Sequence, residues 1–103
     1  MSMDRAMLEK MLNQGEDNAL LRYTLGSICL KEKQYEAAAE HLRQALKMDE
    51  KHSASWKLYG RALALLEHTD EAMAAFDNGI AVAEAKGDVQ AAKEMRVFRK
   101  RLG

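Results

Sequence analysis

A 34-residue period constrains the fold of this chain more than any other feature of its sequence. Four positions of one stretch have counterparts 34 residues later, two of them identical and two of them again large and mainly apolar. The two sets are Leu25, Gly26, Ala38 and Leu42, then Tyr59, Gly60, Ala72 and Phe76. A fixed period of this size is typical of a repeat array, in which each unit buries its apolar face against the next. The period therefore predicts stacked, similar units.

The composition favours helices alone. The 103 residues include no proline and only six glycines, and no stretch shows the sustained alternation of a strand. Apolar residues recur at spacings of three and four, which predicts helices joined by short connections, so that successive helices are antiparallel neighbours. Six helices are expected. Five of them cover about 3–12, 18–31, 35–47, 69–86 and 88–102, and the other begins at 53 and ends before a turn at 67–68.

The ends of these helices carry recognisable stop and start residues. Gly15 and Gly87 are expected to end helices, because glycine takes the left-handed conformation at little cost. Side chains that accept hydrogen bonds from backbone N–H groups are expected at the starts. The predicted N-caps are Ser2, Asp17 or Asn18, Ser53, Thr69 and Asp88.

The spacing resembles the tetratricopeptide repeat, or TPR. One copy reads Trp56-x-x-Tyr59-Gly60-x-x-Leu63 followed by Ala72-x-x-x-Phe76, and the weaker copy reads Arg22-x-x-Leu25-Gly26-x-x-Cys29 followed by Ala38-x-x-x-Leu42. The resemblance implies an all-α fold, in which antiparallel helical hairpins stack as a short right-handed TPR solenoid of about six helices. It also implies that Trp56 fills the gap between hairpins.

The same resemblance divides residues 1–103 as a single TPR domain. The N-terminal helix within 1–15 resembles the second half of a repeat, because Leu8, Leu42 and Phe76 are spaced by 34. Repeat one covers 19–52, repeat two covers 53–86, and 87–103 forms a C-terminal capping helix whose register departs from the period. The proline usual in the family is replaced by Glu50 and Glu84, so the helix containing Glu84 is expected to run on to Lys86.

Glycine inside a helix costs roughly 1 kcal/mol relative to alanine. Gly26 and Gly60 both fall in the middle of a predicted helix, at equivalent places. We expect them to allow close approach of the two helices in each hairpin, with Ala38 and Ala72 opposite.

The sequence does not indicate an enzyme, a metal site or a cofactor. His41, His52 and His68 lie on three different elements, and Cys29 is a lone cysteine on a core stripe. None of the spacings that hold zinc or activate a nucleophile occurs. The expectation is a non-catalytic protein.

Charge and hydropathy argue against nucleic-acid and membrane partners. Sixteen basic residues balance 16 acidic ones, and no run approaches the roughly 18 apolar residues of a membrane span. The basic cluster of Arg96, Arg99, Lys100 and Arg101 is interpreted as a solvated helix face. With its single cysteine, the chain is expected to be cytoplasmic.

The helix of 18–31 has a second apolar stripe, which is expected either to pack or to bind a ligand. By resemblance, the first helix of each repeat lines a concave groove, which here holds a tyrosine, apolar surface and two basic side chains. The predicted groove residues are Leu20, Tyr23, Ser27, Leu30, Ala54, Lys57, Arg61, Ala64 and Leu65. This mixture suits a peptide with an apolar anchor and a carboxylate. The alternative is that the chain's own terminal helix fills the groove.

Some TPR proteins grip acidic chaperone tails through a carboxylate clamp of lysine and asparagine. Here the corresponding positions hold Tyr23, Ser27 and Leu58, so this activity is not expected. The sequence therefore predicts a scaffold or adaptor that binds an unidentified peptide segment or helix in its concave groove. The rival hypothesis is a self-associating structural protein, a homodimer paired through the groove or the capping helix.

Overall fold

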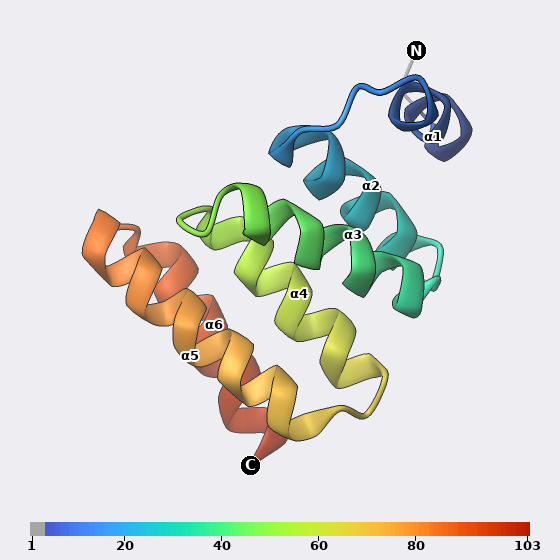
Figure 1. Cartoon of the computed structure of the whole chain (residues 1–103). Coiled ribbons are helices and arrows are strands. Elements are labelled where there is room, and N and C mark those ends of the chain that lie inside the picture. Colours follow the sequence, from blue (N-terminus) through green and yellow to red (C-terminus); the bar gives the residue numbers. More distant parts are fainter. Residues whose placement is uncertain (1–3) are drawn as a thin grey trace.

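The computed structural model describes residues 4–103, which form six α-helices and no strand. Their bounds are α1 Arg5–Asn13, α2 Ala19–Lys31, α3 Tyr35–Met48, α4 Ser53–Leu65, α5 Thr69–Lys86 and α6 Val89–Leu102. Consecutive helices run antiparallel and stack along the molecule, from α1 at one end to α5 and α6 at the other (Figure 1). The predicted all-α repeat fold is confirmed.

Three helix starts are capped by a side chain that accepts a backbone hydrogen bond. Asp4 accepts from the N–H of Met7, Asn18 from that of Leu21, and Asp88 from that of Ala91. Each bond satisfies one of the N–H groups that a helix start leaves without an intrahelical partner. The predictions at Asn18 and Asp88 are confirmed. Ser2 lies outside the described residues.

The capping predictions for Ser53 and Thr69 are wrong. Both are the first helical residue of their helix, and the N-cap positions fall on His52 and His68, neither of which makes a side-chain cap bond. In the turn before α5, Glu67 takes a left-handed conformation (φ 62°). The Ser53 hydroxyl instead donates to Oδ2 of Asp88 at 3.0 Å, which ties the start of α4 to the start of α6.

Helix α5 is one turn longer than its counterpart in repeat one. It runs through Glu84 to Lys86, as expected where no proline intervenes, and it spans 18 residues against 14 in α3. Gly87 then ends it in the left-handed conformation, with φ 74°. Both sequence expectations about this end are confirmed.

Glycine permits close packing within each hairpin. A Cβ atom at Gly26 would lie 2.5 Å from Cγ of Leu42, and one at Gly60 would lie 2.5 Å from Cε1 of Phe76. Real Cβ atoms do not come this near to another side chain, so a larger residue at either position would force the facing side chain or the helices to shift. The repeated glycine therefore fixes the same short helix separation in both repeats.

The first helices of successive units lie side by side. Helix α4 packs against α2 on one side and α6 on the other, whereas α3 and α5 do not pack on each other within residues 4–103. Closer approach of α2, α4 and α6 curves the stack, so these three helices form its inner, concave face. None of the six is long and apolar enough to cross a membrane.

The capping helix closes the largest core cluster. Met95 and Ala92 of α6 are buried against Phe76 and Ala83 of α5. Trp56 is half-buried and packs on the same cluster. Helix α6 therefore occupies the position that the first helix of a third repeat would take.

Candidate functional site

Two adjoining hollows lie between α4 and α6 on the concave face. Their volumes are about 340 Å³ and 230 Å³, and they share Arg61, Phe98 and Arg101. We call them together the α4–α6 groove. The groove is lined by Lys57, Arg61, Ala64 and Leu65 of α4, by Phe76 of α5, and by Glu94, Val97, Phe98, Arg101 and Leu102 of α6.

Two guanidinium groups stand over one aromatic ring at the centre of this groove. The Cζ atom of Arg61 lies 5.0 Å from the centroid of Phe98, and that of Arg101 lies 5.8 Å from it. Phe98 stacks on Phe76, with ring centroids 5.9 Å apart and planes 16° from parallel. Attraction between a cation and a ring face helps to hold each arginine beside Phe98. Within residues 4–103, neither arginine has a carboxylate partner.

A third basic group in the groove is already balanced. Nζ of Lys57 donates to Oε1 of Glu94 at 2.9 Å, across the junction of α4 and α6. The hydrogen bond from Lys57, helped by one from Gln90, holds the pKa of the Glu94 carboxyl below its usual value. The charge left over in the groove is therefore positive and belongs to Arg61 and Arg101.

The structure brings together four of the nine residues that were predicted to line a groove. Lys57, Arg61, Ala64 and Leu65 all line the α4–α6 groove. Leu65 is 49% exposed, and Ala64 also packs against the core cluster behind the groove. An apolar floor therefore lies directly beside the two arginines.

The remaining five predicted residues do not line the α4–α6 groove. Tyr23 packs edge-on against His52, with ring centroids 4.8 Å apart, and Leu30 packs on a core cluster around Cys29. Leu20 is 71% exposed. Ser27 and Ala54 are half-buried on α2 and α4. These side chains therefore lie outside the lining of the α4–α6 groove.

Helix α6 supplies lining residues that the sequence pattern did not identify. In the sequence, the spacing of Phe98 with Ala92, Met95 and Leu102 predicts an apolar core stripe, and Arg101 belongs to the cluster interpreted as a solvated helix face. Glu94, Val97 and Arg101 nevertheless recur at spacings of three and four, which places them on one face of the helix. Reading α6 as the first helix of a third unit would have found this face.

Two arginines of the basic cluster of α6 form ion pairs at the surface. Arg96 pairs with Glu84, and Arg99 pairs with Asp77, so both arginines bind α5. These pairs distinguish Arg101, which points into the groove, from its neighbours in the sequence. The side chains of Arg96 and Arg99 are still 52% and 39% exposed in these pairs, so both remain on a solvated face of α6, as the sequence indicates.

Cys29 has the surroundings of a core residue. Its side chain is 1% exposed and packs with Ala38 and Ala62. Burial raises the pKa of its thiol, whereas a reactive cysteine needs a lowered pKa and access to solvent. It is a packing residue of the α2–α3–α4 junction.

The fold and the open concave face define a helical-hairpin repeat protein. A family model described as anaphase-promoting complex, cyclosome, subunit 3 matches residues 6–79. The TPR repeat-containing protein PA0015 of Pseudomonas aeruginosa is 47% identical over 95 residues, which cover 92% of this chain and 90% of that protein. The chain belongs to the tetratricopeptide repeat family.

Solved structures agree with this assignment. Protein BPP2914 from Bordetella parapertussis is 42% identical and superimposes with a TM-score of 0.84, covering 99% of this chain and 89% of that one. YrrB, described as a TPR protein with an unusual peptide-binding site, is 25% identical with a TM-score of 0.70, covering 95% of this chain and 58% of that one. TPR proteins generally mediate protein–protein interaction and are generally non-catalytic.

Proposed function

We propose that this protein is a non-catalytic scaffold that binds a peptide segment in the α4–α6 groove. The observation that carries the proposal is the pair of arginines over Phe98, whose charge no described carboxylate balances. A guanidinium binds a carboxylate through two parallel N–H···O bonds, and two guanidiniums beside the same ring favour an anionic ligand at this place in the groove. The ligand therefore carries a carboxylate that sits between Arg61 and Arg101.

The rest of the groove suits an apolar side chain beside that carboxylate. The smaller hollow, about 230 Å³, is lined mainly by apolar residues of α4, α5 and α6, among them Ala64, Leu65 and Leu102. A hollow of this size takes one side chain and not a whole small molecule. We therefore infer a recognition element of two neighbouring features, one apolar side chain and one carboxylate.

The α2 side of the concave face offers further contacts to a longer segment. Tyr23 is held against His52, and Leu20 presents a largely exposed apolar surface. A peptide extending from the arginines toward α2 would meet these side chains. The proposed carboxylate site differs from the chaperone-tail clamp, whose positions here hold Tyr23, Ser27 and Leu58, so a chaperone tail is not the proposed ligand.

A peptide array tests the proposed recognition element. Peptides in which an apolar residue precedes a free C-terminal carboxylate are compared with the same peptides ending in an amide. The proposal expects the wild-type protein to select the free acids, and the Arg61→Glu variant to lose that preference while it keeps its helical circular dichroism. Equal binding of acids and amides by the wild-type protein would contradict it.

Self-association is the second candidate function. It is favoured by apolar side chains that stand out from the surface, since Leu20 is 71% and Val89 is 74% exposed. Light scattering at several concentrations distinguishes the two proposals. A mass that stays at one chain throughout would exclude the homodimer, and a dimer that dissociates in the Leu20→Glu variant would favour it.

A further inference from the structure

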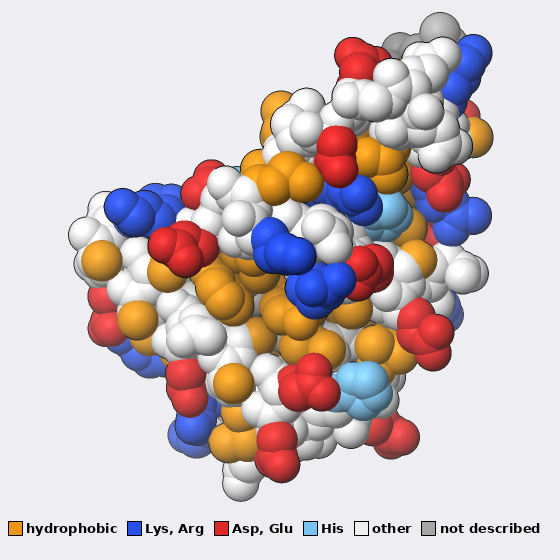
Figure 2. Space-filling model, in the orientation of Figure 1, with side chains coloured by type: hydrophobic (Ala, Val, Ile, Leu, Met, Phe, Trp, Pro, Cys, Tyr) orange, Lys and Arg blue, Asp and Glu red, His pale blue; other side chains and the backbone are white. Residues whose placement is uncertain are grey.

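A separate groove lies on the outer face, between α3 and α5. Two hollows of about 620 Å³ and 330 Å³ meet there and share Trp56 and Glu50. Figure 2 shows hydrophobic side chains gathered in a strip between these two helices, with Lys and Arg side chains bordering it along α3. We call this the Trp56 groove. It faces away from α6 and shares no lining residue with the α4–α6 groove.

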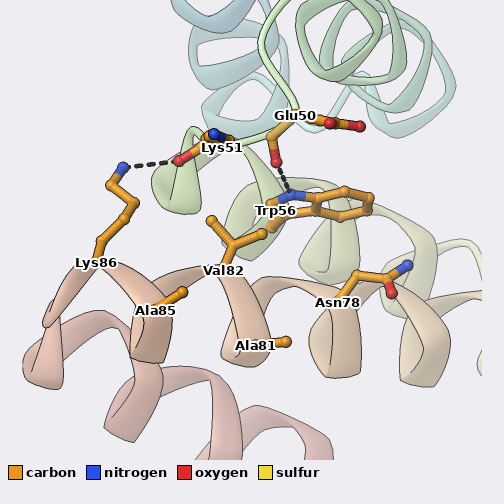
Figure 3. Close-up of a pocket in the computed structure, with 8 residues that line it drawn as sticks. All are labelled: Glu50, Lys51, Trp56, Asn78, Ala81, Val82, Ala85 and Lys86. Carbon is orange, nitrogen blue, oxygen red and sulfur yellow. Dashed lines mark hydrogen bonds between the residues drawn. The ribbon is translucent and has the colours of Figure 1, made fainter.

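Two hydrogen bonds fix the shape of the Trp56 groove. Nε1 of Trp56 donates to the carbonyl oxygen of Glu50 at 2.8 Å, and Nζ of Lys86 donates to the carbonyl oxygen of Lys51 at 2.7 Å (Figure 3). The second bond depends on the last turn of α5, which is present because Glu84 does not end the helix. The turn between α3 and α4 is therefore held against α5 in a defined position.

The floor and one wall of the groove are apolar. The only polar atom of the indole is already bonded, so the exposed part of Trp56 offers carbon surface. Val82, Ala81 and Ala85 line the α5 wall opposite the ring (Figure 3). The lining stretch of α5, residues 78–86, extends about 12 Å at 1.5 Å per residue. That length matches about two turns of a helix laid along the groove.

The rim of the groove is positively charged. Lys47, Lys51 and Lys86 are exposed around it, against the single exposed carboxylate of Glu50. Arg43 also lines it, but its charge is balanced by Glu40 at 2.9 Å. Complementary charge selects a partner and increases its rate of association. The partner that fits is therefore acidic around an apolar anchor.

We propose that the Trp56 groove docks an acidic amphipathic helix of a partner protein, with an apolar residue of that helix against Trp56. The mode is helix-in-groove recognition, in which a partner's apolar face enters an apolar groove between two helices. Because the two grooves open on different faces, one chain can hold a peptide on the concave side and this helix on the outer side. The protein would then join two partners.

The chain's single tryptophan makes the proposal directly measurable. The probe is a synthetic, tryptophan-free helical peptide with leucine along one face and glutamate elsewhere, and its control carries lysine in place of every glutamate. Titration of the acidic peptide is expected to shift Trp56 emission to shorter wavelength with saturation, and the lysine peptide is expected to leave it unchanged. Raising the salt concentration should weaken the acidic complex, because the rim charges are exposed.

A matched pair of variants locates the binding. Ala81→Glu places bulk and negative charge in the Trp56 groove, whereas Ala74→Glu makes the same change at an exposed position of α5 that lines neither hollow. Ala81→Glu is expected to weaken binding by about tenfold or more, which corresponds to about 1.4 kcal/mol, and Ala74→Glu is expected to leave it near the wild-type value. Arg101→Glu should also leave it unchanged.

Several outcomes would overturn the proposal. The first is equal response to the acidic and lysine peptides. The second is the absence of a saturable response to the acidic peptide. The third is full affinity of the Ala81→Glu variant for that peptide. Trp56 emission that changes with protein concentration alone would assign the groove to a second copy of the chain instead.

Discussion

A Cβ atom at Gly60 would lie 2.5 Å from Cε1 of Phe76, so the ring of α5 occupies the space where a side chain on α4 would be. The same relationship holds 34 residues earlier, between Gly26 and Leu42. This pair of contacts sets the separation of the helices in each hairpin.

Replacing Gly60 by alanine is predicted to destabilise the protein. Alanine gains roughly 1 kcal/mol of helix propensity over glycine, but overpacking of a core costs typically 1–3 kcal/mol. The aromatic ring of Phe76 has less freedom to move than the aliphatic Leu42, so the second term should win at Gly60. We expect a net loss of about 1 kcal/mol in urea unfolding, and a smaller loss for Gly26→Ala. A more stable Gly60→Ala variant would contradict the packing account.

Helix α6 is predicted to be an integral part of the fold and not a loose cap. Met95 is fully buried, and truncating a buried methionine to alanine typically costs 2–5 kcal/mol. Lys93→Ala, an exposed position of the same helix, should change stability by no more than about 0.5 kcal/mol. Equal effects of the two substitutions in chemical unfolding would show that α6 is not packed as described.

Asp88 is predicted to make stability depend on pH in the acid range. The hydrogen bond from the N–H of Ala91, and then that from the hydroxyl of Ser53, lower its pKa below its ordinary value of 3.8. A carboxyl with a lowered folded pKa contributes stability that is complete above the ordinary value and is lost as the pH falls through the folded value. The melting temperature of wild type should therefore fall more steeply below about pH 4 than that of Asp88→Asn. Parallel curves for the two proteins would contradict this role.

Cys29 is predicted to be unreactive until the protein unfolds. Its side chain is 1% exposed and burial raises the pKa of its thiol, so little thiolate is present and little of it is reachable. A chromogenic thiol reagent should label the native protein slowly and the urea-unfolded protein at once. Rapid labelling of the native protein would show that the α2–α3–α4 junction opens readily.

Much of the fold could be predicted from the sequence because features that are weak evidence alone recur at equivalent positions of the two repeats. Glycine inside a helix is unusual alone, but Gly26 and Gly60 in phase with Leu42 and Phe76 are consistent with one packing arrangement. The continuation of helix α5 to Lys86 could also be predicted from a local property, because Glu84 stands where the family usually has a proline. Such features depend on contacts within one hairpin, which the period reveals.

The candidate site was less predictable because it depends on contacts between units. The period fails in α6, so the repeat pattern did not align Arg101 with Arg61 or place Phe98 in the lining of the α4–α6 groove. The wrong cap at Ser53 has the same origin, since its hydroxyl bonds to Asp88, 35 residues away. Residues whose roles are set by distant partners require the three-dimensional arrangement.

The measurement that tests the central claim most directly is the affinity of two matched α6 variants for one carboxylate-ended peptide. Arg101→Glu and Lys100→Glu change the net charge equally at adjacent positions, but only Arg101 lines the α4–α6 groove. Calorimetric titration with a free-acid peptide selected from the array is predicted to show affinity reduced about tenfold or more for Arg101→Glu. Lys100→Glu should bind within about twofold of wild type. Equal affinities for the two variants would contradict recognition of a carboxylate between Arg61 and Arg101.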